Sequence, residues 1–298
     1  MANEIEFDKV KLDNGENLAY RKTGKGEKII LLIHGNTSSS KDWDLFMENI
    51  SEKKYTLYAP DLRGFGESSY NEKIDRIEDL AEDLKLFCDK LGLKEFNIIG
   101  WGAGGTVSMR FTINYQEYVQ RLILLESSSI KGFPIYKDGE YLASRGEIKE
   151  VVKPALKAYK WKDKFILNKI ARWTMKKVCE RSKFTTHTPE SNRYEAYIDE
   201  MLKQRNLVDF NFALSYFNIS HEHNGLIEGT GEVDEIEVPT LVFYGDHDEV
   251  VTREMQEETV EGIGENAELK IIKNSGHSPF IDRLEDLIAI IDNFLNKN

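Results

Sequence analysis

Short apolar runs alternate with amphipathic stretches over the first and last parts of the chain. The runs have the length of buried strands and occupy residues 29–33, 55–59, 96–99, 122–125, 240–244 and 269–272. Between them, apolar residues recur at spacings of three and four, as in residues 77–91, where Gly92 is placed to end the helix. This alternation predicts an α/β fold with a doubly wound, mostly parallel sheet.

The first two strand-like segments follow a different pattern. Residues 10–12 and 18–22 flank Asp13, Asn14 and Gly15, a sequence typical of a tight hairpin turn. We therefore expect an antiparallel hairpin ahead of the parallel strands.

The middle of the chain interrupts the alternation. From residue 130 to residue 233 the strand signal disappears, and helical, aromatic-rich sequence replaces it. Strand and helix patterns resume at Val238 and Pro239. The sequence therefore predicts a core formed by residues 1–129 and 234–298, with residues 130–233 inserted as a helical cap.

Length and charge restrict the class of protein. With 298 residues, 40% of them hydrophobic, the chain can bury one large core and a cap. A net charge of −12 argues against a nucleic-acid partner. The amino-terminal residues lack the basic and apolar regions of a signal peptide, and no apolar run approaches the ~20 residues needed to span a bilayer. We expect a cytoplasmic protein without a membrane span.

The cysteine and histidine spacings do not predict a metal site. Cys88 and Cys179 lie in separate helical patterns, so idle thiols are expected and not a disulfide. His221 and His223 are separated by Glu222 alone, whereas the zinc-binding helix motif places two further residues before its second histidine. A turn is the simpler interpretation of this segment.

The run at residues 96–99 leads directly into a cluster of small residues around Gly102. In the G-x-S-x-G nucleophile elbow, a strand ends in a sharp turn whose central residue projects its side chain toward a substrate, and a helix follows at once. Gly100, Ala103, Gly104 and Gly105 supply the small neighbours that such a turn requires. Gly102 holds the central position, so the turn is predicted without its serine oxygen.

The same glycines also satisfy a second motif. Gly100, Gly102 and Gly105 fit G-x-G-x-x-G, and Glu126 closes the next apolar run where a ribose-binding acid would stand. A dinucleotide site, however, explains none of the chemical groups that follow the other strands. We therefore favour the elbow and expect no organic cofactor.

Chemical groups follow three other predicted strands. Gly35 and Asn36 come after the run at residues 29–33, in a turn where a backbone N–H can face a developing oxyanion. Asp248 follows the run at residues 240–244, and His277 follows the run at residues 269–272. The carboxyl ends of parallel strands meet at one edge of a sheet, where open α/β folds build their sites.

In content and order, these motifs resemble those of the α/β-hydrolases. The resemblance extends over essentially the whole chain and is carried by residues 34–36, 61–68, 100–105, 245–248 and 276–280. It implies an α/β-hydrolase fold that needs neither a metal nor an organic cofactor.

The resemblance also implies a role for each matching position. Gly102 occupies the nucleophile's place, Asp248 that of the triad acid and His277 that of the general base. The backbone N–H groups of Asn36 and Ala103 would form the oxyanion hole.

Several neighbouring residues have more than one interpretation. Gly35 and Trp101 lie where they could contact substrate, although a large aromatic packed beneath the site is the simpler interpretation of Trp101. Glu126 is an alternative triad acid, but we favour Asp248. His34 is expected to shape the oxyanion turn without moving protons.

The reaction implied by the resemblance is acyl transfer from an ester to serine and then to water. Gly102 offers no hydroxyl, and removing the nucleophile of a studied triad costs on the order of 10⁶ in kcat. Two explanations remain open. The chain is a carboxylic-ester hydrolase with its serine replaced, or it binds a ligand or works through His277 and Asp248 without a nucleophile.

Charge is segregated within the predicted cap. Residues 149–183 contain 12 Lys or Arg and 3 acidic residues, a local net charge of +9. Basic residues recur there at helical spacing, namely Lys149, Lys153, Lys157, Lys160 and Lys164. A solvated helix face and a docking surface for an anionic substrate, a polymer particle or a membrane surface both fit this pattern.

A looser resemblance concerns the substrate. Residues 129–135 and 218–225 are similar to segments of intracellular short-chain polyhydroxyalkanoate depolymerases of the same superfamily. This similarity implies a hydroxyalkanoate ester as substrate, either a small molecule or a polyester. The basic cap would then contact a granule surface.

Overall fold

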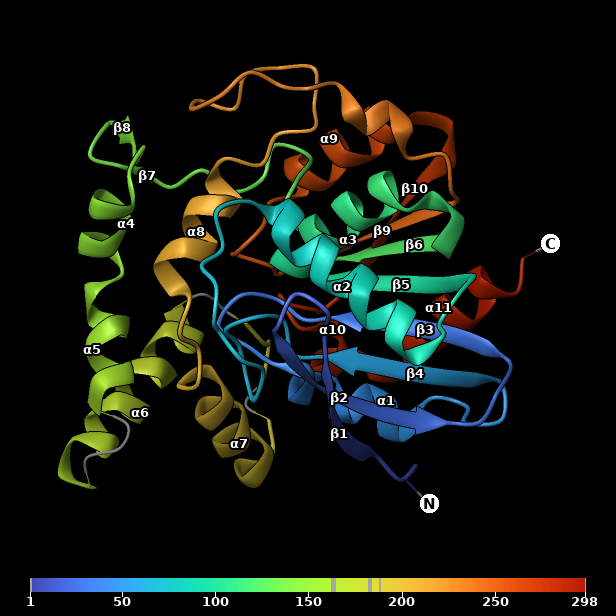
Figure 1. Ribbon diagram of the computed structural model, residues 1–298, viewed down its shortest axis with the longest axis horizontal. Helices are drawn as coiled ribbons and strands as arrows, with labels where there is room; N and C mark the ends of the chain where they lie inside the picture. Colours follow the sequence, from blue (N-terminus) through green and yellow to red (C-terminus); the bar gives the residue numbers. More distant parts are fainter. Residues whose placement is uncertain (1, 162–164, 182–183, 188, 298) are drawn as a thin grey trace.

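A mixed eight-stranded sheet forms the centre of the molecule (Figure 1). The computed structural model describes residues 2–161, 165–181, 184–187 and 189–297. The strands follow the spatial order β1-β2-β4-β3-β5-β6-β9-β10. Their bounds are β1 Glu6–Lys11, β2 Asn17–Gly24, β3 Lys28–Ile33, β4 Tyr55–Pro60, β5 Phe96–Trp101, β6 Val119–Leu125, β9 Thr240–Gly245 and β10 Ala267–Ile272.

Strand direction follows the sequence pattern. The pairings of β2 with β1 and with β4 are antiparallel, and the other neighbours in this sheet pair in parallel. The apolar runs all lie within strands, and the predicted helix at residues 77–91 is α2, Ile77–Leu91. Gly92 ends it with φ 67°, a conformation that suits glycine. The predicted α/β fold with a mostly parallel sheet is confirmed.

Helices cover both faces of the sheet because successive strand residues point to opposite sides. In β3, Leu31 and Ile33 belong to a core shared with α2 and α3, Ala103–Asn114, and α9 packs on the same side. Ile30 and Leu32 belong to a second core, shared with α1 and α11. The remaining bounds are α1 Asp44–Asn49, α9 Arg253–Ile263, α10 Pro279–Asp282 and α11 Leu284–Leu295.

A further group of helices lies beyond the carboxyl ends of the parallel strands, on the left in Figure 1. These are α4 Arg145–Val151, α5 Lys153–Trp161, α6 Phe165–Arg181, α7 Ser191–Met201 and α8 Leu207–Ser215. The turn between α7 and α8 is hydrogen-bonded to the core. Arg205 donates from its backbone N–H to Gly64 O at 2.8 Å, and Asn206 Nδ2 donates to Arg63 O at 2.7 Å. The domain boundaries at residues 130 and 233 stay a prediction.

The expectation that residues 130–233 contain helical sequence without strands was wrong at one place. Two short antiparallel strands, β7 Tyr136–Lys137 and β8 Glu140–Tyr141, form an exposed hairpin there. Asp138 and Gly139 turn the chain with φ 53° and 95°. Strands of two exposed residues are too short to produce an apolar alternation in the sequence.

The first turn of α3 lies against the ends of β3. A Cβ atom on Gly104 would lie 2.5 Å from Ile33 O and would also collide with His34 O. A Cβ on Gly100 would lie 2.6 Å from Gly104 O. Neither position therefore has room for a side chain, and helix and strand backbones pack in direct contact.

Gly104→Ala is expected to destabilise the protein by about 1–3 kcal/mol, because its methyl group meets backbone atoms that cannot move aside. The measurement is the free energy of unfolding in urea. Gly146→Ala is the matched control, since Gly146 is also helical and its Cβ would have no contact closer than 3.7 Å. The control should be neutral or stabilising by up to about 1 kcal/mol. Equal effects at both positions would refute the close approach of α3.

Candidate active site

Gly102 is the single residue between β5 and α3. Its backbone has φ 55° and ψ −125°, a conformation that costs a residue with a side chain on the order of 1–3 kcal/mol. Its N–H donates to Leu125 O at 3.0 Å, and its carbonyl accepts from the N–H groups of Gly105 and Ser128, each at 3.1 Å. Backbone hydrogen bonds thus fix this turn to the end of β6.

His277 and Asp248 lie together in the loops that follow β10 and β9. His277 Nδ1 is 2.8 Å from Asp248 Oδ2, and both side chains are buried. Asp248 Oδ1 accepts from the backbone N–H groups of Val250 and Val251, at 2.6 and 3.2 Å. The carboxylate is therefore held by backbone donors as well as by the imidazole.

The other imidazole nitrogen points to the turn at Gly102. A Cβ built on Gly102 would lie 3.1 Å from His277 Nε2. With Nδ1 engaged by Asp248, Nε2 is free to accept a proton from a group at this position. The structure therefore brings together the residues that the sequence assigned to nucleophile, base and acid.

A cavity of about 150 Å³ opens between these groups. Its lining includes Gly35, Asn36, Trp101, Gly102, Ala103 and His277. Ala103 is the first residue of α3, so its N–H has no partner within that helix. The Asn36 side chain accepts from Gln204 Nε2 at 2.9 Å, which ties the turn after β3 to the helices above it.

Trp101 supports His277 as well as lining this cavity. Its indole Nε1 donates to His277 O at 2.7 Å, and only 2% of its surface is exposed. Its ring packs edge-on against Phe280 and Phe184. The ring is therefore mainly a packed support, with one side available to a ligand.

His34 turns away from the cavity. Its Nε2 accepts from the Leu62 N–H at 3.0 Å, and its Nδ1 lies 2.8 Å from Gly35 O. Burial lowers the pKa of this imidazole. His34 is thus a neutral side chain that links two loops, in agreement with a shaping role.

Glu126 lies at the carboxyl end of β6 with φ 47° and is fully buried. Neither carboxyl oxygen has a hydrogen-bond partner among the described residues. Burial foremost, and then the charge of Asp248, raise the pKa of Glu126 well above its usual range. The hydrogen bond to His277 is made by Asp248, so the geometry favours Asp248 as the acid.

Other chemical groups lie apart from the cavity. His221 pairs with Asp234, and His223 accepts from the Gly225 N–H within the turn expected there. Cys88 and Cys179 are free thiols. Across the described ranges, no group of His, Cys, Asp or Glu side chains is arranged to hold a metal, and no helix combines the length and hydropathy needed to cross a bilayer.

Sequence reasoning missed a second cavity beside the first. It measures about 280 Å³ and shares Thr37, Trp101 and Phe184 with the smaller one. Asp42 lies in its wall, in a capping box with Ser39. The spacing of Ser39 and Asp42 predicts such a cap, but nothing local in the sequence indicates that the carboxyl faces a cavity.

Comparisons with known proteins identify the family of this chain. The family described as alpha/beta hydrolase fold matches residues 28–284. The chain is 26% identical over 292 residues to the AB hydrolase superfamily protein YisY of Bacillus subtilis, a match that covers 96% of this chain and 98% of the relative. A segment of 115 residues is 30% identical to serine hydrolase BPHL of Mus musculus, and spans 37% of this chain and 40% of the mouse protein.

Among solved structures, an esterase from Exiguobacterium antarcticum superposes with a TM-score of 0.77. The two chains are 17% identical, and the match covers 98% of this chain and 100% of the esterase. At this identity the likeness concerns the fold. Together with the family match over most of the sequence, it shows that the chain belongs to the alpha/beta hydrolase family.

Proposed function

We propose that the chain carries the site of a carboxylic-ester hydrolase with glycine in the nucleophile position. The observation that supports this proposal is the 3.1 Å separation between a Cβ on Gly102 and His277 Nε2. A hydroxyl on that Cβ would fall within reach of an imidazole that Asp248 already orients.

The proposed chemistry is acyl transfer in two steps. His277 removes the proton of a serine hydroxyl as the oxygen attacks the ester carbonyl, and Asp248 stabilises the resulting imidazolium. The N–H groups of Asn36 and Ala103 bind the oxyanion until the alcohol leaves with the proton from His277. Water then attacks the acyl group by the same proton path and releases the acid.

A second candidate function needs no nucleophile. Among the described residues, none hydrogen-bonds His277 Nε2, which faces the cavity beside Gly102. An imidazole in this position can activate a water molecule or hold a polar ligand. The chain would then be a ligand-binding protein, or a cofactor-free enzyme that uses His277 and Asp248 alone.

Gly102→Ser is expected to create esterase activity, or to raise it by a factor on the order of 10⁶ in kcat. The substitution should also lower stability by about 1–3 kcal/mol, since φ 55° is strained for a residue with a Cβ. Hydrolysis of short acyl esters and urea unfolding measure the two effects.

Gly102→Ala provides the matched control for this experiment. It introduces the same Cβ and the same strain without a hydroxyl, so it should lose stability and remain inactive. His277→Ala in the Gly102→Ser background should abolish the new activity. A folded Gly102→Ser protein that hydrolyses no ester or thioester contradicts the hydrolase proposal and favours the second candidate.

The identity of the acid can be tested in the same active background. Asp248→Asn should lower kcat by about 10⁴, as loss of the acid does in a well-studied triad. Glu126→Gln should leave kcat at the same order of magnitude, because Glu126 makes no hydrogen bond to His277. The opposite ranking would assign the acid to Glu126.

Stability should depend on pH through Glu126. Its pKa is raised in the folded protein, so the unfolded chain loses this proton first as the pH rises. The contribution of Glu126 to stability is complete below the ordinary carboxyl pKa of about 4.3 and declines as the pH rises toward the folded-state value. Urea unfolding from acid to neutral pH should show a smaller decline for Glu126→Gln, and equal declines would contradict the buried neutral acid.

We also propose that the basic helices α5 and α6 dock the protein on an anionic or polyester surface. Lys153, Lys157 and Lys160 are exposed on α5. On the neighbouring α6, Trp173 is 60% exposed and Ile170 is 45% exposed. Basic and apolar side chains combine in helices that bind interfaces. Lys164 and Lys183, which belong to the same charge pattern, lie outside the described residues.

Charge reversal at Lys153, Lys157 and Lys160 should weaken sedimentation with anionic vesicles and with hydroxybutyrate polyester particles, most strongly at low salt. The same change in the Gly102→Ser background should leave hydrolysis of a small soluble ester unchanged. Charge reversal at the exposed Lys25, Lys73 and Lys94 is the control for net charge. Equal effects of the two triple variants would support a merely solvated helix face.

A further inference from the structure

The larger cavity lies between the core and the helices above it. Its volume is about 280 Å³, and its walls come from the loop after β3, from α6 and α7 and from the segment after β10. Thr37, Trp101 and Phe184 line both this cavity and the smaller one at Gly102. A single elongated ligand could therefore place one end in each.

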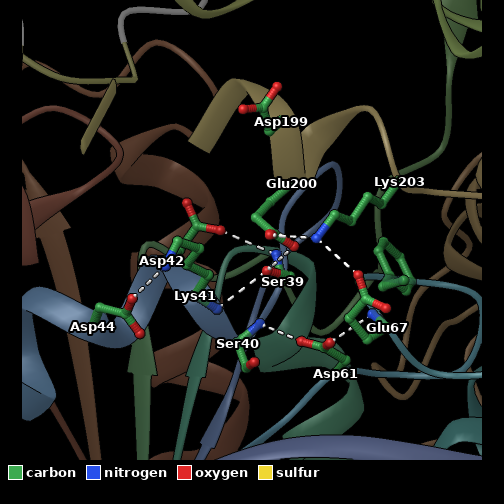
Figure 2. Close-up of polar contacts among 12 residues, drawn as sticks. Ser39, Ser40, Lys41, Asp42, Asp44, Asp61, Glu67, Asp199, Glu200 and Lys203 are labelled. Carbon is green, nitrogen blue, oxygen red and sulfur yellow. Dashed lines mark hydrogen bonds and ion pairs between the residues drawn. The ribbon is translucent and has the colours of Figure 1, made fainter. Parts of the chain in front are cut away.

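The carboxyl group of Asp42 lacks a cation among the described residues, unlike those of Asp44 and Glu200 beside it (Figure 2). One Asp42 oxygen accepts from the Ser39 N–H at 3.0 Å, and the other is directed away from the polar cluster. By contrast, Glu200 pairs with Lys203 at 2.7 Å, and Asp44 pairs with Arg21 at 2.8 Å.

Within the described part of the chain, Asp42 is therefore an acid without a cation at the cavity wall, whereas Asp61, which also lacks a cation, accepts from two backbone N–H groups. Among the described residues, no Lys or Arg lines the cavity or pairs with Asp42. Burial foremost raises the pKa of Asp42 to about 7, and the negative charges of Glu200, Asp44 and Asp61 contribute. A positive ligand group would balance the charge of Asp42 and so favour its ionised form in this buried, negatively charged environment.

The remaining wall suits an organic cation. Aromatic rings of Trp101, Phe184, Tyr194 and Tyr197 surround the space, and ring faces attract ammonium groups. Tyr197 is 7% exposed, and the Arg193 guanidinium lies near its hydroxyl.

We propose that this cavity binds the ammonium group of an amine-bearing carboxylic ester, with Asp42 as its counter-ion. The inference rests on the proposed hydrolase function, because it places the ester carbonyl at His277 and the ammonium group beyond Trp101. Asp42 would thus determine substrate specificity.

Binding to the chain with Gly102 in place tests this proposal without any hydrolysis. The probes are ω-aminoalkyl acetates of increasing length, each compared by calorimetry with the alkyl acetate that has a methyl group in place of the ammonium. At one length the amine should bind more tightly than its counterpart. The ratio of the amine's affinity to that of its alkyl counterpart should fall about tenfold from one pH unit above the pKa of Asp42 to one unit below. The reason is that the ionised fraction of Asp42 falls by the same factor.

Other titratable groups at the cavity are distinguished by variants. Cys179 of α6 and Tyr197 of α7 stay neutral through this range, because burial raises the pKa of each far above it. His187 and Glu180 also line the cavity. His187→Gln and Glu180→Gln should each keep the pH dependence, whereas Asp42→Asn should remove both the preference for the amine and its pH dependence.

The two proposals fail in different ways. If no aminoalkyl acetate binds more tightly than its alkyl counterpart, or if hydroxyalkyl acetates bind best, the ammonium site is refuted while ester hydrolysis by Gly102→Ser can still succeed. If the preference survives in Asp42→Asn or disappears in His187→Gln, Asp42 is not the counter-ion. The pH dependence of the unsubstituted chain tests the proposal even if the Asp42 variant does not fold.

Discussion

The direct contact between the start of α3 and the ends of the central strands is the constraint on which the site depends. Gly104 leaves no room for a side chain against Ile33 O, and only one residue separates β5 from α3. The chain can reverse within that distance only if Gly102 adopts a positive φ. In that conformation a Cβ at position 102 would point toward His277, so backbone packing sets the direction of any side chain at this position.

Three buried carboxyl groups near the ends of the strands differ in what compensates their charge. Asp248 receives two backbone N–H groups and faces the imidazole of His277. Glu126 lies beside it with no partner among the described residues, and the charge of Asp248 adds to the cost of ionising it. Asp42 has one backbone donor and an open side. The three carboxyl groups therefore differ in how many hydrogen-bond donors the protein supplies to each.

The sequence predicts the parts of this protein that depend on local pattern. Buried parallel strands are continuous apolar runs, and α2 has regular apolar spacing with a glycine at its end, so these elements are found within a few residues of their bounds. The order of the motifs also placed Gly102, Asp248 and His277 at one edge of the sheet. The hairpin of β7 and β8 left no such signal. Nor did the cavity at Asp42, because Tyr197 and Phe184 reach it through tertiary packing.

The contacts that fix the turn at Gly102 are independent of the side chain at that position. The hydrogen bonds of Gly102 come from its N–H and its carbonyl. A side chain at position 102 supplies none of these contacts. The orientation of His277 is likewise set from elsewhere, by Asp248 on one side and by Trp101 through a hydrogen bond to its carbonyl. The conformation of the turn and the orientation of His277 therefore do not depend on which side chain stands at position 102, and this independence is what the proposed exchange of Gly102 for serine exploits.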